Sequence, residues 1–206
     1  MTTNELHSKE PSGKRVDARR NAQTVLDAAA ELFVTFGVDV PVRDIAARAG
    51  VGTGTLYRHF PTRADLIVAV YRHQVDTCAE VGEDLLRSAA PYAALKQWIH
   101  LFADFLITKQ GLASVMQSTD PSYSALHTYF LERLVPVGAQ LIGAAAAASK
   151  IRRDVTAFEL LRGVGNLCIG AGSTPDYSAR RLIDVLLDGL CSIPLEDSVS
   201  EVAVRQ

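Results

Sequence analysis

The chain has 206 residues, 48% of them hydrophobic, and a formal net charge of −2 at pH 7. This length allows one or two domains with a sizeable core, and the near-neutral charge excludes a protein that coats nucleic acid nonspecifically. The charge is uneven, because residues 1–63 hold nine basic and seven acidic side chains, a net +2, while the rest of the chain has a net charge of −4.

Four of the basic side chains form a cluster near the start of the chain: Lys14, Arg15, Arg19 and Arg20. Such an arm can follow DNA phosphates or enter a minor groove. A solvated, disordered tail explains residues 1–13 equally well. A helix is predicted next, over residues 18–36, with Gly37 as its left-handed cap. Its apolar stripe consists of Val25, Leu26, Ala29, Leu32, Phe33 and Phe36.

Residues 43–63 are the most informative segment, because their pattern predicts two short helices joined by a tight turn. Ala46 falls where the helices come closest and only a small side chain fits, and Gly50 falls at the turn, where positive φ is expected. The apolar underside consists of Ile45, Ala49, Val51 and Leu56. Any short helical hairpin can contain one alanine and one glycine. A helix this short buries little, however, so a hydroxyl-rich, basic outer face indicates DNA binding. That face consists of Thr53, Thr55, Tyr57, Arg58 and His59.

Two blocks in this segment are similar to a known family. They are Arg43-Asp44-Ile45-Ala46 with Ala49-Gly50-Val51, and Thr55-Leu56-Tyr57-Arg58-His59-Phe60 followed by Arg63. From about residue 17 to about residue 71 the chain resembles the DNA-binding domain of TetR-type (TetR/AcrR) transcriptional regulators, with many matches at fixed spacing. The resemblance implies an all-α homodimeric repressor that leaves a palindromic operator when a small molecule binds its second domain.

The resemblance also implies how individual residues meet double-stranded operator DNA. Four residues would be placed to read sequence from the starts of the second and third helices: Arg43, Thr53, Gly54 and Thr55. Three would contact phosphates: Tyr57, His59 and Arg63. Family members often have Thr or Ser where this chain has Pro41 and Val42. Pro41 can open a helix but supplies no hydroxyl cap, so we expect Asp44 in the first turn to contribute more of the stabilisation.

Apolar periodicity and helix-breaking residues predict six further helices, about nine in all. They cover residues 63–88, 91–108, 112–118, 121–148, 154–170 and 176–191. Thr62 and Asp154 are placed to cap two of them, and Pro136 should kink or split a third. We expect residues 1–13 to be a basic-ended tail, 14–75 a helix-turn-helix domain, 76–194 a ligand-binding and dimerisation domain, and 195–206 a flexible tail.

The last two predicted helices have the pattern of an interface. The helix over residues 176–191 is apolar around most of its circumference, so it needs two partners, its own core and a second copy of the chain. The resemblance implies a four-helix dimer bundle, and the alternative is a monomer with both helices internal. The expected interface residues are Leu160, Val164, Leu167, Leu182, Leu186 and Leu190.

Aromatic side chains gather in the middle of the chain, where the resemblance implies a ligand pocket. Pockets are mostly apolar with a few polar anchors. The residues expected to line this one are Trp98, Phe102, Phe105, Met116, Tyr123, Tyr129 and Asn166. His100, Asp104 and His127 are further polar candidates, and a plain core role is the alternative for each aromatic side chain. The hypothesis is a small hydrophobic or aromatic effector that lowers operator affinity.

Other classes of function are weighed against a regulator. The three cysteines lie far apart without a Cys-x-x-Cys pair, so we expect no disulfide framework and no metal site. We expect neither enzyme activity nor a cofactor, because the chain has no nucleophile elbow, phosphate-binding loop or His-Glu zinc motif. A polar N-terminus and the lack of a long apolar run predict a cytoplasmic protein without a membrane partner. A ligand-independent adaptor or an activator stays open. A preformed cavity behind Trp98 and Phe102 would favour a regulator that senses a ligand. A solid core there would favour an adaptor without a ligand.

Overall fold

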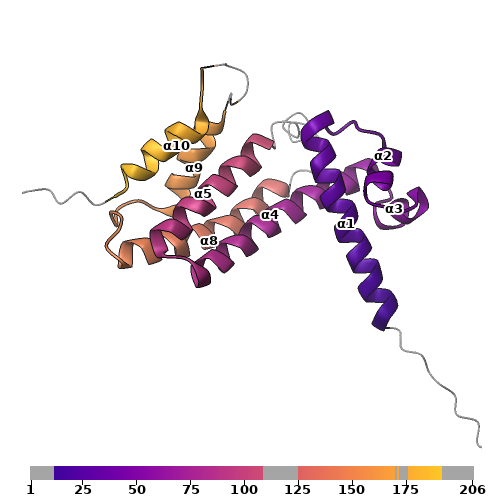
Figure 1. Ribbon diagram of the computed structural model, residues 1–206, viewed down its shortest axis with the longest axis horizontal. Helices are drawn as coiled ribbons and strands as arrows, with labels where there is room; N and C mark the ends of the chain where they lie inside the picture. The colour runs from indigo at the N-terminus through magenta and orange to yellow at the C-terminus, as the bar shows by residue number, and fades with distance from the viewer. Residues whose placement is uncertain (1–11, 109–124, 170, 172–175, 192–206) are drawn as a thin grey trace, which may run out of the picture. The chain divides into compact units, whose positions relative to one another are not determined.

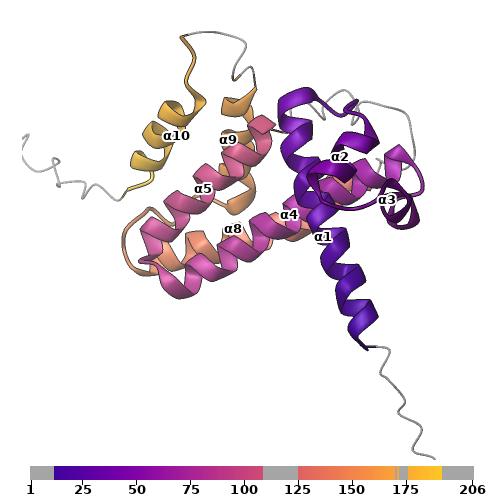
Figure 2. The ribbon, with the colours of Figure 1, turned by 45° about the vertical axis from the view of Figure 1, so that its right-hand side comes forward.

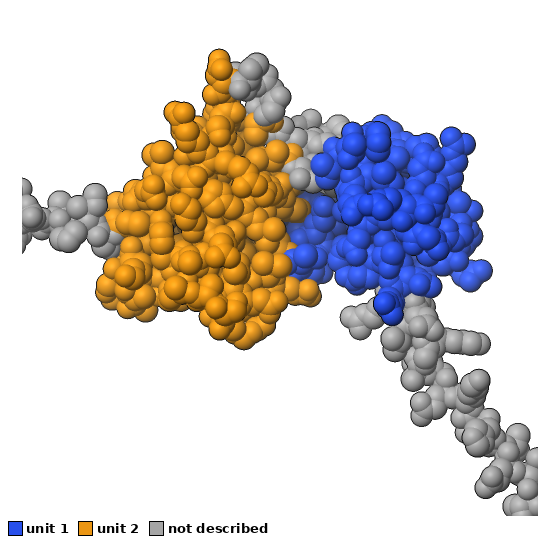
Figure 3. All heavy atoms as spheres, in the orientation of Figure 1, with its two compact units in different colours: residues 1–77, 108–132 blue, residues 78–107, 133–206 orange. Residues whose placement is uncertain are grey.

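The computed structural model describes residues 12–108, 125–169, 171 and 176–191. Over this part of the chain the structure is helical, with one isolated bridge between Ile151 and Cys191 and no strand, so the expected all-α fold is confirmed (Figure 1). The expected helix over residues 112–118 lies outside the described residues. The chain forms two compact units, residues 1–77 with 108–132 and residues 78–107 with 133–206 (Figure 3). The expected domain boundaries stay a prediction.

The first unit holds three N-terminal helices, which lie against one another in both ribbon views (Figures 1 and 2). They are α1 (Ser12–Phe36), α2 (Val42–Arg48) and α3 (Thr53–His59). The first part of α4 (Arg63–Ser88) and the first turns of α8 (Leu126–Ala147) complete the unit. Its buried core includes Val25, Ala29, Phe33, Ile45, Leu56, Leu66 and Val70.

Local sequence explains where these helices begin and end. Gly37 ends α1 with φ of 78°, and its N–H donates to the Phe33 carbonyl at 3.1 Å, as expected for a left-handed cap. Thr62 caps α4 as predicted, since its hydroxyl accepts from the Asp65 N–H at 3.1 Å. The prediction that Phe36 faces the core is wrong: it is 68% exposed. As the last residue of α1 it instead lines an open groove with the loop that follows.

The second unit contains the remainder of α4 and α8 together with α5 (Pro91–Thr108), α9 (Ala157–Cys168) and α10 (Ala179–Asp188). Its helices approach closely at two glycines. A Cβ on Gly82 would lie 2.4 Å from Val137 Cγ1 and 2.7 Å from Trp98 Nε1. A Cβ on Gly138 would lie 3.3 Å from the other end of the same indole. Trp98 is therefore held between α4 and α8, and it is fully buried.

Three expectations about the later helices are wrong. α9 is capped by Thr156, not Asp154, because Thr156 and Glu159 form a capping box while Asp154 pairs with Arg152. α10 begins after its cap Ser178 and ends at Asp188, so it is shorter than residues 176–191. α8 begins at Leu126, not at residue 121, and Pro136 does not split it, while the expected kink stays a prediction. Pro136 is exposed, so water can satisfy the carbonyl that loses its partner.

α8 is also the one helix among the described residues that is long and apolar enough to cross a membrane by length and composition. This corrects the expectation that no segment reaches that length. A core helix passes the same test, and 44% of its most apolar window is buried inside the structure. α8 is explained as part of the core.

Candidate nucleic-acid interface

The turn between α2 and α3 has the geometry that the sequence predicts. Ala46 is 1% exposed, and its carbonyl accepts from the Val51 N–H at 3.0 Å. Gly50 has φ of 69°, in the left-handed region where a Cβ is costly. Leu56 of α3 is 1% exposed and anchors the helix from beneath. The turn and the core contacts together fix the orientation of α3.

The outer face of α3 is open. Thr53, Gly54, Arg58 and His59 are exposed, Tyr57 is 52% exposed and Thr55 is half-buried. A Cβ added to Gly54 would meet nothing within 4 Å, and its φ is not positive. The fold therefore does not require glycine at this position. Its bare backbone leaves room for close approach by another molecule.

The start of α2 has the features that the sequence predicts. Pro41 is the N-cap residue, with φ of −60° and no side-chain hydrogen bond, as expected. Asp44 lies in the first turn, where a carboxylate favours the helix dipole. Its Oδ1 is 3.4 Å from Nε of Arg43, whose side chain is 82% exposed. An ion pair this exposed contributes little and leaves Arg43 accessible.

Arg63 lies in different surroundings from the other six residues expected to touch DNA. Its Nη2 donates to the Val40 carbonyl at 2.8 Å, and the residue is half-buried. Its Nε is buried and has no hydrogen-bond partner. The sequence did not indicate this contact, because the two residues are 23 positions apart in the chain.

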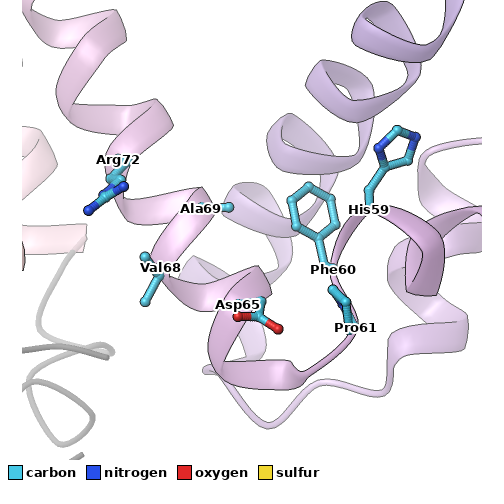
Figure 4. Close-up of a pocket in the computed structure, with 7 residues that line it drawn as sticks. All are labelled: His59, Phe60, Pro61, Asp65, Val68, Ala69 and Arg72. Carbon is cyan, nitrogen blue, oxygen red and sulfur yellow. The ribbon is translucent and has the colours of Figure 1, made fainter. Parts of the chain in front are cut away.

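A hollow of about 460 Å³ lies beside the end of α3, between its C-cap residue Phe60 and α4 (Figure 4). The hollow is lined by His59, Phe60, Pro61, Asp65, Val68, Ala69 and Arg72. Figure 4 shows Phe60 pointing toward the α4 side, and Phe60 is 8% exposed. The hollow was not predicted from sequence: His59 and Phe60 belong to the family-like block, but the lining residues on α4 follow no motif.

Tyr129, which is expected in the ligand pocket, joins α8 to α4 within the first unit. Its hydroxyl lies 2.7 Å from both carboxylate oxygens of Asp76, and the Arg72 guanidinium lies 5.1 Å from the centre of its ring. A cation above an aromatic face at this distance is attractive. Neither Arg72 nor Asp76 was predicted from sequence, since no motif includes them.

The other expected pocket residues fall into three groups. Trp98, Phe102 and Phe105 are buried, and the Trp98 indole N–H donates to the Cys78 carbonyl at 2.9 Å. Asn166 is exposed on α9. Met116 and Tyr123 lie outside the described residues. The pocket assignment stays a prediction, and the contacts of Trp98 are those of a packed core side chain.

Two of the polar candidates are engaged between α5 and α10. His100 Nε2 lies 3.1 Å from Asp184 Oδ1, and Lys96 Nζ lies 2.8 Å from the same oxygen. Hydrogen bonds from Lys96 first, and then from His100, lower the pKa of Asp184. Asp104 pairs with Arg180 in the same interface. These groups therefore attach α10 to α5.

The six expected interface residues lie on α9, on α10 and, for Leu190, just after α10, and they differ in how buried they are. Leu160, Val164 and Leu190 are buried, Leu167 and Leu186 are half-buried, and Leu182 is 37% exposed. Phe158 and Val185, which are not among the six, are 47% and 64% exposed. Val185 belongs to the apolar pattern expected over residues 176–191, whereas Phe158 was not predicted. A groove of about 370 Å³ lies here, lined in part by Leu160, Gly163, Val185 and Leu186.

The described residues contain no group of three or more His, Cys, Asp and Glu side chains that could hold a metal ion. None of the three cysteines forms a disulfide. Burial raises the pKa of the Cys78 thiol to about 12 and that of Cys168 to about 11. The thiols of Cys78 and Cys168 are therefore protonated at neutral pH and act as small apolar side chains.

The turn, the anchored α3 and its open polar face define a DNA-binding protein of the helix-turn-helix class. Residues 25–70 match the family model described as "Bacterial regulatory proteins, tetR family", and residues 90–192 match "Transcriptional regulator SbtR-like, C-terminal domain". The chain belongs to the TetR family of transcriptional regulators.

Solved structures and curated relatives agree with this assignment. A TetR transcriptional regulator from Streptomyces coelicolor is 35% identical with a TM-score of 0.70, over 82% of this chain and 98% of that one. A TetR regulatory protein from Mycobacterium vanbaalenii is 31% identical with a TM-score of 0.67, over 87% of this chain and 99% of that one. An HTH-type transcriptional regulator of Staphylococcus aureus (strain MRSA252) is 31% identical over 128 residues, 59% of this chain and 66% of the relative's length.

Proposed function

We propose that this chain is a homodimeric repressor that leaves a palindromic operator when a small hydrophobic or aromatic molecule binds its second unit. The observation that carries the proposal is the outer face of α3, where Thr53, Tyr57 and His59 are exposed beside the bare backbone of Gly54. Hydroxyl and imidazole groups suit phosphate oxygens, and an exposed helix start suits the major groove.

The dimer is supported by apolar side chains that the single chain leaves uncovered. Phe158, Leu182 and Val185 are exposed on α9 and α10, which lie side by side. Large exposed apolar groups on adjacent helices are typical of an interface between copies. Two DNA-binding units in such a dimer would meet successive major grooves about 34–36 Å apart. We expect elution as a dimer at micromolar concentration. Monomeric elution with monomeric DNA binding would count against it.

The packing around Trp98 bears on where a ligand could bind. Trp98 is in close contact with Gly82 on one side and Gly138 on the other, which leaves no room for a ligand against those two edges of the indole. A ligand in the second unit would therefore have to lie elsewhere. The close packing around Trp98 supports the second candidate function, a regulator that responds to no ligand.

A reporter experiment separates these alternatives. A promoter that contains a DNA site selected by the purified protein is joined to a reporter gene in cells with and without this chain. A repressor lowers expression, and an activator raises it. Hydrophobic compounds are then screened for a rise in melting temperature and for release of DNA. An inducer raises the melting temperature and also releases DNA. If every compound has only one of these two effects, the proposal of ligand-induced release is wrong.

A further inference from the structure

The Arg63 side chain forms a hydrogen bond within the protein, although the family resemblance implies that it contacts DNA. Its Nη2 donates to the Val40 carbonyl at 2.8 Å. Its Nε is buried without a hydrogen-bond partner. Arg43, Tyr57 and His59, by contrast, are exposed. Much of the Arg63 guanidinium is therefore directed into the protein.

The partner of Arg63 lies at the point where α2 begins. Val40 is 6% exposed and directly precedes Pro41, the N-cap of α2. The Val40 N–H also bonds back to the Gly37 carbonyl at 3.4 Å. The Arg63 hydrogen bond thus connects the first residue of α4 to the short loop from which α2 starts.

Apart from the Asp44 carboxylate and the buried Ile45, α2 has little else to hold its first turn. It has seven residues, and only Ile45 and Ala46 are buried. Pro41 provides no side-chain cap. A helix this short is unstable unless its surroundings support it. Since Arg43 lies in this first turn, any shift of the turn moves Arg43 as well.

We propose that Arg63 is a positioning residue for DNA recognition. Its guanidinium holds the start of α2 in place through Val40, and through α2 it places Arg43, without contacting phosphate itself. A hydrogen bond from a charged donor to a partly buried carbonyl is strong enough for this role. The proposal rests on the proposed function, since it assumes that Arg43 meets DNA.

Salt dependence separates positioning from phosphate contact. The variants are Arg63→Met and Arg63→Lys, and the probe is a duplex recovered by selection with the unmodified protein. Loss of one phosphate contact lowers the slope of log K against log salt by about 0.9. We expect Arg63→Met to weaken binding at least tenfold while the slope changes by much less than about 0.9. Arg87→Met is the control for charge, since Arg87 is exposed near the end of α4 and lies outside the unit that holds the helix-turn-helix.

The lysine variant sharpens the comparison. Lys keeps the charge, but its ammonium ends about one bond short of the Nη2 atom that donates to Val40, and it has no counterpart of the buried Nε. We expect Arg63→Lys to bind nearly as weakly as Arg63→Met. Recovery of affinity and of the salt slope by Arg63→Lys would overturn the proposal and make Arg63 a phosphate contact.

A double-mutant cycle tests the link to Arg43 directly. If Arg63 acts by placing Arg43, then Arg43→Ala should cost much less in the Arg63→Met background than in the unmodified protein. Additive losses would mean that the two side chains act independently, and the proposal would be wrong.

Hydrogen exchange of the free protein needs no DNA, so it distinguishes failure of this inference from failure of the proposed function. The N–H groups of Asp44 and Ile45 donate to the Pro41 carbonyl in the first turn of α2. We expect them to exchange faster in Arg63→Met, while the Phe60 N–H at the end of α3 keeps its protection. If Arg63→Met unfolds as a whole, the same comparison is made with Arg63→Lys. Unchanged protection of α2 overturns the proposal.

Discussion

At the scale of single residues, exposure separates the side chains that can meet DNA from those that hold the fold. Arg43 is 82% exposed and has only a weak ion pair with Asp44. Trp98 is fully buried, with its indole N–H bonded to the Cys78 carbonyl. Both residues were singled out by sequence as functional. The structure leaves that role open for Arg43 and favours a packing role for Trp98.

Arg43→Ala should weaken operator binding by about 1–3 kcal/mol and relax the preference at one base pair, if Arg43 reads a base. The measurement is the affinity for the selected site and for single-base variants of it. Tyr57→Phe is the comparison, because loss of a phosphate-bound hydroxyl should weaken binding to all sequences alike. An equal loss on every sequence for Arg43→Ala would show a backbone contact instead.

Gly82→Ala should destabilise the second unit. The new Cβ would lie 2.4 Å from Val137 Cγ1 and 2.7 Å from Trp98 Nε1. Overpacking of this kind costs about 1–3 kcal/mol, and chemical denaturation measures it. Gly143→Ala is the matched control, since a Cβ there meets nothing within 4 Å and alanine favours a helix. Equal effects of the two substitutions would contradict the close packing around Trp98.

At the scale of elements, the sequence predicted helices well and their boundaries less well. Gly37 and Gly50 were recognised because positive φ selects glycine. The N-terminus of α9 was misplaced because Asp154 and Thr156 both suit a cap. The choice depends on Arg152, which pairs with Asp154, and on Glu159, which completes the capping box of Thr156. Contacts over long sequence separation, such as that of Arg63 with Val40, follow no local pattern and were not predictable.

The capping box of α9 makes a pH-dependent prediction. The Thr156 hydroxyl and N–H bind the Glu159 carboxylate and lower its pKa. A carboxylate whose pKa is lowered by folding stabilises the folded state at pH values above its pKa in the unfolded chain. This stabilisation is lost as the pH falls through the pKa of the folded state. Thr156→Ala should therefore lower the melting temperature at neutral pH, and by less in acid below the folded pKa of Glu159. Thr156→Ser keeps the hydroxyl and should change little. If Thr156→Ala lowers the melting temperature equally at every pH, the Glu159 carboxylate does not contribute to the effect.

Val185→Glu should break the dimer without unfolding the chain. Val185 is 64% exposed on α10, so a charge there costs the single chain little, whereas a buried unpaired charge is costly in an interface. Sedimentation or elution volume measures the oligomeric state. Gln97→Glu, which adds the same charge at an exposed position of α5, should leave the dimer intact. A dimer that tolerates Val185→Glu would place the interface elsewhere.

At the scale of the whole molecule, one unit carries the helix-turn-helix and the other carries the exposed apolar residues of α9 and α10. α4 and α8 each contribute to both units. Such continuous helices provide a physical route by which an event in one unit can change the other. The sequence identified the DNA-binding helices with precision because their spacing is distinctive. It could not identify a ligand, because apolar residues serve cores and pockets alike.

The most direct test of the central claim is selection of bound genomic fragments by the purified protein. If α3 reads DNA in a dimer, the recovered fragments share a palindrome whose half-sites lie one helical turn, or a multiple of it, apart. Arg43→Ala should recover the same palindrome with one position relaxed. Fragments without a common sequence, or a single unpaired half-site bound by a monomer, would contradict the account.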